Sequence, residues 1–229
     1  MPNAMHYIRE MNDLPAADST RDQLLDAAER LFVERGPDDV SARAIVREAG
    51  QKNQSALQYH FGGREGLITA IIERRMQQLE ARREKFLSEA LAESAEPDLR
   101  SLCAVMVRAP FTLCRDQRAF REFLGKLGQR LTTDNPDPAV ASTIQALPSL
   151  QVLRDRVRAH LEHIPVPLLL LRASSTYFFV LLTISRRASM GGTFRGTEAE
   201  LFFNNLVDQV AAMMAAPPSP DTESLLNHN

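Results

Sequence analysis

Apolar residues recur at intervals of three and four positions along most of this chain, and no stretch shows the alternation of a half-buried strand. The pattern predicts an all-α protein. We expect helices over residues 19–35, 64–92, 98–115, 117–129, 139–163, 166–187 and 197–214, with an interruption near Pro148 and a loop at 133–138. Two further short helices are expected within residues 41–61.

Residues 41–61 have the most informative pattern. Ser41 stands at an N-cap position, and Gly50 is suited to end the first short helix. The predicted inner faces of the two helices are small and apolar, formed by Ala42, Ile45, Val46, Ala49, Ala56, Leu57 and Phe61. The pattern predicts two packed helices joined by a tight turn.

The remaining sides of the second short helix are polar. Amides such as Gln58 pair with base edges, and hydroxyl groups such as those of Ser55 and Tyr59 bond phosphate oxygens. Any soluble helix exposes polar residues, however, and helix pairs joined by glycine occur in many all-α proteins. The residues on either side favour the DNA-binding interpretation.

An amphipathic helix precedes this pair, with Ser19 or Thr20 as its expected cap and Arg35-Gly36-Pro37 as its end. Another begins after Gly62-Gly63. With these flanks, residues Thr20 to about Leu67 resemble the tetracycline-repressor-like (TetR/AcrR) transcriptional regulators. The resemblance is carried by Leu31 to Gly36, Ser41 to Val46, Ala49-Gly50, Ala56 to Phe61 and Gly62 to Leu67, in that order.

The resemblance implies an N-terminal three-helix DNA-binding domain containing a helix-turn-helix. Ser41 and Arg43 would contact phosphate or guanine, and Tyr59, His60 and Arg64 would contact phosphates. The groove-facing candidates are Gln51, Lys52, Asn53, Gln54, Ser55 and Gln58. Two features depart from the common pattern: one extra residue between Gly50 and Phe61, and Ala44 where many members carry an acid.

Net charge adds little support for DNA binding. Residues 19–66 contain seven Arg or Lys and eight Asp or Glu, and the whole chain has a formal net charge of −2. Nonspecific binders of polyanions are usually basic overall. We therefore expect the few cations of this domain to gather on one face.

The last two predicted helices are apolar over much of their circumference, so each needs cover on several sides. An internal core would supply that cover, as would a second copy of the chain. The family pairs these two helices in a homodimer, which would place two recognition helices on half-sites roughly 34 Å apart. The candidate interface residues are Phe178, Leu182, Phe202, Leu206, Val210 and Met213.

A small-molecule effector is also implied by the resemblance. Candidate ligand contacts are Met106, Phe111, Phe120, Phe123 and Tyr177, although aromatic residues at helical spacing are more often plain core. The absence of Trp and the few obvious buried charges favour a lipophilic effector. A ligand that binds better to one form of the dimer would change its affinity for DNA.

Other features set limits on the class of protein. Cys103 and Cys114 are too few for a metal cluster and are expected to be buried thiols, with a thiol sensor as the alternative. We expect no cofactor, no metal and no signal peptide. The apolar stretch 164–185 is interrupted by Pro165, Pro167 and Arg172, which indicates a core helix and no membrane partner.

The predicted organisation is a flexible arm (1–18), a DNA-binding domain (19–66), a helical effector-binding and dimerisation domain (67–215) and a flexible tail (216–229). We predict a cytoplasmic, homodimeric transcriptional repressor that binds a palindromic operator in double-stranded DNA and is released by its effector. A helical adaptor would leave the polar face near Gln58 without a role. A small helical enzyme is disfavoured because the five His residues, among them His160 and His163, show no catalytic or ligand spacing.

Overall fold

The structure, a computed structural model, describes residues 16–36, 39–53, 55–127 and 147–226 of the 229-residue chain, with side chains described from Thr20 onward. All regular secondary structure in these ranges is α-helical, which confirms the predicted fold class. The chain divides into two compact units, Met1–Arg74 and Arg75–Asn229. The boundary lies within helix α5, later than the predicted domain boundary at residue 66.

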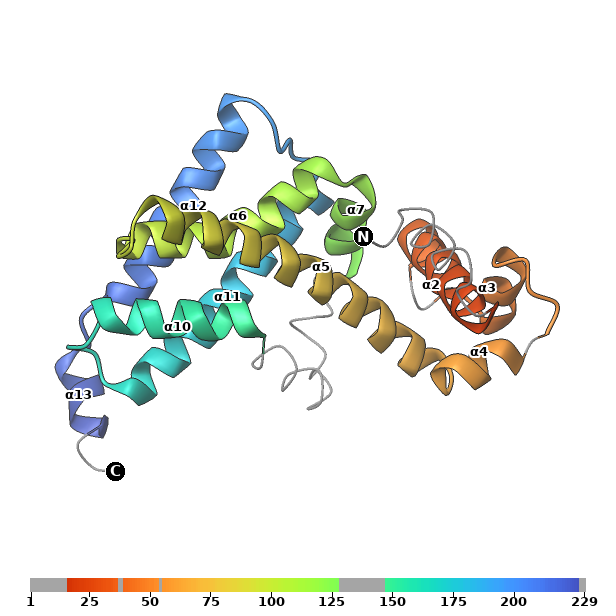
Figure 1. Cartoon of the computed structure of the whole chain (residues 1–229), viewed down its shortest axis with the longest axis horizontal. Coiled ribbons are helices and arrows are strands. Elements are labelled where there is room, and N and C mark those ends of the chain that lie inside the picture. Colours follow the sequence, from red (N-terminus) through yellow and green to blue (C-terminus); the bar gives the residue numbers. More distant parts are fainter. Residues whose placement is uncertain (1–15, 37–38, 54, 128–146, 227–229) are drawn as a thin grey trace, which may run out of the picture. The chain divides into compact units, whose positions relative to one another are not determined.

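The first unit contains α2 (Ala16–Arg35), α3 (Ala42–Glu48), α4 (Ser55–Phe61) and the start of α5 (Arg64–Glu93), drawn in red to orange in Figure 1. Each helix contributes apolar side chains to one small core. Its fully or nearly fully buried members include Leu24, Leu25, Phe32, Ile45, Val46, Leu57, Leu67 and Ile71. The predicted inner-face residues Ile45, Val46 and Leu57 are buried, whereas Ala42, also predicted to face inward, is exposed.

Helix α2 begins at Ala16, before the predicted cap at Ser19 or Thr20. The predicted cap is wrong because Ala16 and Ala17 have high helix propensity and continue the helix upstream. The end of the helix is as predicted. Gly36 has φ of 84°, and its N–H donates to the Phe32 carbonyl at 2.9 Å.

Among its described residues, the second unit contains the rest of α5 together with six further helices. These are α6 (Leu99–Asp116), α7 (Arg118–Leu127), α10 (Pro148–His160), α11 (Val166–Ser189), α12 (Thr197–Ala215) and α13 (Pro220–Leu226). Helix α11 packs against α6, α7 and α12 (Figure 1). At its contact with α7, the Ser185 hydroxyl donates to the Leu124 carbonyl at 2.7 Å.

Gly125 allows α7 and α11 to approach this closely. A Cβ at Gly125 would lie 3.2 Å from the Ser189 backbone nitrogen and 3.3 Å from the Ala188 carbonyl carbon. Backbone atoms cannot move away as a flexible side chain can. The absence of a side chain at Gly125 therefore fixes the spacing of the two helices.

The chain ends differ in part from the predictions. Residues 220–226 form α13 within the predicted flexible tail, although none of its residues is buried. Local capping explains this helix: Ser219 Oγ accepts from Thr222 N–H at 3.3 Å, and Pro220 stands at its first position. Residues 1–15, 128–146 and 227–229 lie outside the described ranges, and they include the predicted loop at 133–138.

Helix α11 is the one helix among the described residues that is long and apolar enough to cross a membrane. Core helices of soluble proteins also meet this test of length and composition. Only 39% of its most apolar window is buried within the chain. An apolar face of α11 therefore remains uncovered by the described part of the chain.

Candidate nucleic-acid interface

Helix α4 is held to the first unit along one face. Leu57 is its only buried residue, with Ala56 and Phe61 half-buried beside it. The preceding turn fixes the start of the helix, because Asn53 Oδ1 accepts from Ser55 N–H at 2.9 Å. The other sides of α4 are free to contact a partner.

The outer side of α4 carries the most exposed aromatic residue of the described chain. The Tyr59 side chain is 82% exposed, and its ring meets His60 edge to face at 5.0 Å. Four neighbouring candidates are also exposed, namely Lys52, Asn53, Ser55 and Gln58. This surface combines an amine, amides, a hydroxyl and a phenol, which are the groups that bond base edges and phosphates.

Helix α3 adds two cations to this polar segment. Ser41 Oγ accepts from Ala44 N–H at 3.2 Å, which confirms the predicted N-cap and leaves the hydroxyl proton available. Arg43 is exposed as predicted, and Arg47 is exposed one turn later. Sequence reasoning passed over Arg47, although its spacing from Arg43 would have placed both on one helical face.

Ion pairing explains how an acidic unit can present a basic face. Arg74 pairs with Asp26 at 2.6 Å and with Glu29, and Arg30 lies 3.5 Å from Glu48. These carboxylates are thus partly neutralised by cations outside residues 41–61. Within residues 41–61, Glu48 is the only carboxylate, against the three exposed cations Arg43, Arg47 and Lys52.

Two predicted contact residues are instead engaged within the unit. Gln51 is half-buried, and its side chain donates to Gln23 Oε1 on α2 at 2.8 Å. Arg64 Nη1 donates to the Val40 carbonyl at 2.7 Å, its guanidinium lies over the Phe32 ring, and Nη2 is buried. These internal contacts do not favour the predicted phosphate contact of Arg64, which stays a prediction.

Two further candidates for DNA contact, His60 and Gln54, are not placed on the exposed surface of α4. His60 is half-buried, with the Phe61 ring centroid 6.2 Å from its own. Gln54 lies outside the described residues.

Four of the five predicted ligand contacts belong to the core of the second unit. Phe120 and Phe123 are 0% exposed, and Tyr177 is buried with its hydroxyl 3.6 Å from Met76 Sδ. Phe111 is buried and Met106 is half-buried. None of the five lines either of the two pockets described for this unit.

The expectation of few buried charges is wrong for α5. Arg83 is 1% exposed, and its Nη1 donates to Glu80 Oε2 at 2.7 Å and to Ser149 Oγ at 3.2 Å. Ser149 in turn donates to Glu80 Oε2 at 2.6 Å. This buried network links α5 to α10 and weakens the argument for a purely lipophilic effector.

The predicted interface residues fall into two groups. Leu206 and Val210 are 1% and 0% exposed within one chain, so they are corrected to internal core residues. Phe178 and Leu182 of α11 remain 36% and 43% exposed. Phe202 and Met213 are half-buried. The mistake arose because a single stripe on α12 cannot be divided between core and interface without the neighbouring helices.

Neither cysteine has the environment of a reactive thiol. Cys103 and Cys114 are free and buried, and burial raises the pKa of each to about 12. A thiol at that pKa is almost entirely protonated near neutral pH, which disfavours the sensor alternative. Among the described residues, no three His, Cys, Asp or Glu side chains are placed to hold a metal ion.

Comparison with known proteins agrees with this arrangement. The sequence model of the bacterial regulatory proteins of the tetR family matches residues 24–71, which include all of α3 and α4. No curated protein matches the chain.

Solved structures extend the likeness in fold to most of the chain. A tetR family transcription regulator from Shewanella sp. PV-4 has a TM-score of 0.59 at 16% identity, covering 86% of this chain and 96% of that one. A tetR-family regulator from Streptomyces coelicolor has a TM-score of 0.56 at 22% identity, covering 92% and 88%. Residues 24–71 therefore match the helix-turn-helix DNA-binding domain of the bacterial regulatory proteins of the tetR family, and the chain has the fold of solved tetR-family transcription regulators.

Proposed function

We propose that this protein is a homodimeric repressor that binds a palindromic operator through α3 and α4 and is released by a small-molecule effector. The exposed surface of α4 and its turn carries the proposal. Tyr59, Gln58 and Lys52 are held outward by a helix whose inner face is packed. The match of residues 24–71 to the tetR-family model favours DNA over a protein partner for this polar surface.

Within this interface we assign two kinds of role. Gln58 is the candidate for reading a base, because its amide can both donate and accept toward adenine. Arg43, Arg47, Lys52 and Tyr59 are candidates for phosphate contacts, which position the protein without reading sequence. Asn53 uses its side-chain oxygen within the turn, so only its amide N–H groups remain for DNA.

The exposed apolar face of α11 supports homodimerisation. Leu171, Phe178 and Leu182 lie seven and four residues apart, on one side of the helix, and are 66%, 36% and 43% exposed. Contiguous apolar surface of this kind marks interaction sites. A second copy would cover it and would supply the second recognition helix that a palindromic operator requires.

We propose repression and effector release by analogy with the tetR-family regulators that this chain resembles. A repressor of this kind acts on chromosomal DNA, so we also propose a cytoplasmic location. A ligand that favours a form with lower operator affinity would shift the population away from DNA.

The experiment is selection of genomic DNA fragments by the purified full-length protein, followed by binding titrations on the enriched site. We expect a two-fold symmetric site. Tyr59→Phe should weaken binding to all sequences alike, whereas Gln58→Ala should relax preference at one position of each half-site. Gln77→Ala, at an exposed glutamine of α5, is the matched control. Enrichment of no symmetric site, or unchanged binding by both α4 variants, contradicts the proposal.

The dimer is tested by sedimentation velocity of Leu171→Glu/Leu182→Glu. Two carboxylates on this face should convert dimers into monomers and remove operator binding. Leu225→Glu changes a leucine that is 72% exposed on α13 and should leave the dimer intact. A dimer that survives the double substitution would place the interface elsewhere.

A further inference from the structure

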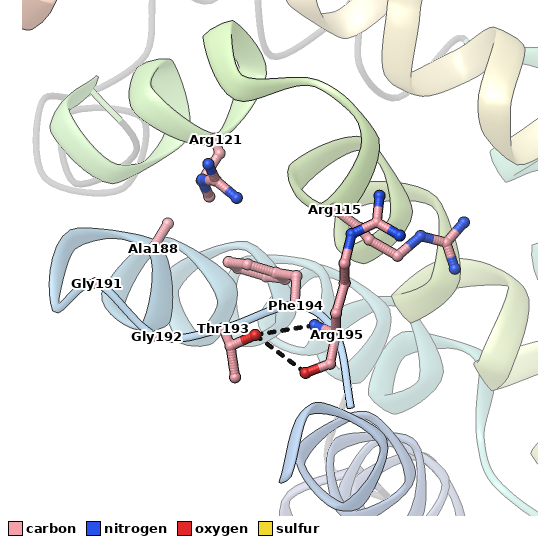
Figure 2. Close-up of a pocket in the computed structure, with 8 residues that line it drawn as sticks. All are labelled: Arg115, Arg121, Ala188, Gly191, Gly192, Thr193, Phe194 and Arg195. Atoms are coloured by element: carbon pink, nitrogen blue, oxygen red, sulfur yellow. Dashed lines mark hydrogen bonds between the residues drawn. The ribbon is translucent and has the colours of Figure 1, made fainter. Parts of the chain in front are cut away.

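A pocket of about 310 Å³ opens in the second unit where the end of α6, α7 and the segment after α11 meet (Figure 2). Three arginines from these three segments line it, Arg115, Arg121 and Arg195. Gly192, Thr193 and Phe194 line it as well, and none of its lining residues is acidic. Its chemistry differs from the apolar effector site expected from the sequence.

Local hydrogen bonds shape the segment that connects α11 to α12. Gly191 has φ of 73°, and Gly192 N–H donates to the Arg187 carbonyl at 2.9 Å. Thr193 Oγ1 accepts from Arg195 N–H at 3.1 Å and donates to the Arg195 carbonyl at 3.0 Å, as drawn in Figure 2. These bonds hold Arg195 at the pocket in a defined backbone conformation.

Positive charge exceeds negative charge around the pocket. Asp116 lies 2.8 Å from Arg115 Nε, 3.0 Å from Arg82 Nη1 and 3.9 Å from Arg195 Nη2. One carboxylate is therefore shared by three guanidinium groups. These cations repel one another, and an anion placed among them would reduce the repulsion.

Arg121 is the best-placed cation for an added ligand. It is half-buried, and its Nη1 lies 3.5 Å from the Cys114 carbonyl, at the limit of a hydrogen bond. Within the described part of the chain, no carboxylate forms an ion pair with it. Figure 2 shows its side chain between α7 and the segment that contains Ala188 and Phe194.

We propose that this pocket binds a small organic anion through phosphate or carboxylate groups. Guanidinium groups present paired N–H donors that match the oxygens of both anions. Phe194 provides an apolar wall for the rest of the molecule, and the volume is at the lower end of the range for ligand sites. The pocket lies in the second unit, whereas the DNA-binding candidates lie in the first.

Isothermal titration calorimetry of the full-length protein with pyrophosphate, and separately with citrate, tests this proposal at constant ionic strength. We expect one site per chain for at least one probe. Arg121→Gln and Arg195→Gln should each weaken binding about tenfold, as loss of one charge-assisted contact predicts. The Arg195 side chain is 73% exposed, so its variant should fold even if the half-buried Arg121 tolerates change poorly.

Two control variants separate this pocket from other cationic surfaces. Arg118→Gln removes a neighbouring α7 arginine that is 81% exposed and paired with Glu122, and it should leave anion binding unchanged. Arg43→Gln removes a cation of the DNA-binding candidate surface and should also have no effect. Thermal melts by circular dichroism confirm that each variant is folded.

Each result decides the proposal. Binding of pyrophosphate alone assigns a phosphate-bearing ligand, binding of citrate alone assigns a polycarboxylate, and binding of both supports a general anion site. Absence of binding for both probes overturns the proposal, as does binding that survives Arg121→Gln and Arg195→Gln but is lost in Arg43→Gln. None of these outcomes depends on whether the protein represses transcription.

Discussion

The proposed DNA-binding surface and the arginine pocket both gather cations, but they are built in opposite ways. The DNA-binding surface takes Arg43, Arg47 and Lys52 from one short segment and leaves them exposed. The pocket takes Arg115, Arg121 and Arg195 from three segments, with Asp116 held between two of them. Exposed, separated cations can bind phosphates along an extended polyanion such as DNA. Cations that converge on one pocket can bind a single small anion.

The largest expected effect is a loss of operator affinity when cations of the proposed DNA-binding surface are removed, with the arginine pocket left unchanged. Arg43→Gln/Lys52→Gln should weaken operator binding by roughly 10- to 100-fold, because two phosphate contacts are lost. The slope of log affinity against log salt should fall by about 2. Fluorescence anisotropy with a labelled operator measures both quantities.

The same double variant should bind pyrophosphate as the unsubstituted protein does, since the pocket lies in the other unit. Lys85→Gln, at an exposed lysine of α5 paired with Glu89, is the control for loss of charge alone. An unchanged salt slope would remove Arg43 and Lys52 from the DNA-binding surface.

A smaller effect compares the stability of the two units. Ser41 caps α3 in the first unit, and Asp98 caps α6 in the second by accepting from Ser101 N–H at 2.7 Å. Ser41→Ala and Asp98→Ala should each lower the free energy of unfolding by about 1 kcal/mol. Urea denaturation followed by circular dichroism gives the values. If the units unfold separately, each substitution should move only one of two transitions.

The smallest expected effect concerns the pKa of Asp116, which lies beside the pocket. The Arg115 guanidinium, with Arg82, lowers the pKa of Asp116 to about 2 from the usual 3.8. Because the folded-state value is depressed, the stabilisation is present above about pH 4 and is lost as the pH falls toward 2. Carboxyl NMR titration should find this midpoint, and Arg115→Gln should raise it toward the ordinary value. A midpoint near 3.8 in the unsubstituted protein would show that the ion pairs are weak in solution.

Sequence reasoning succeeded where the determinants are local. The stops at Gly36 and Gly50, the cap at Ser41 and the inner faces of the first three helices depend on neighbours within a few residues. The helix α13 depends equally on local capping, but it was missed because its segment lacks an apolar pattern. Hydrophobic periodicity thus found packed helices and overlooked an exposed one.

Long-range contacts account for the other differences. Arg64 follows the exposed end of α4 by one turn in sequence. Its guanidinium nevertheless bonds the Val40 carbonyl and lies over the Phe32 ring, inside the unit. Leu206 and Val210 could be assigned to the core only once α6 and α11 were in place beside α12. The arginine pocket joins residues 115 and 195. No rule of sequence spacing connects positions so far apart, so the sequence alone could not predict the arginine pocket.

The bond between Gln51 and Gln23 has a consequence for how operator specificity can change. A substitution at Gln58 would alter one exposed side chain with little effect on folding, and under the proposed function it should change the preference for a single base. A substitution at Gln51 would instead remove the hydrogen bond that ties the turn before α4 to Gln23 of α2. We therefore expect Gln58→Ala to leave the backbone of α4 in place, whereas Gln51→Ala should loosen the turn that precedes it.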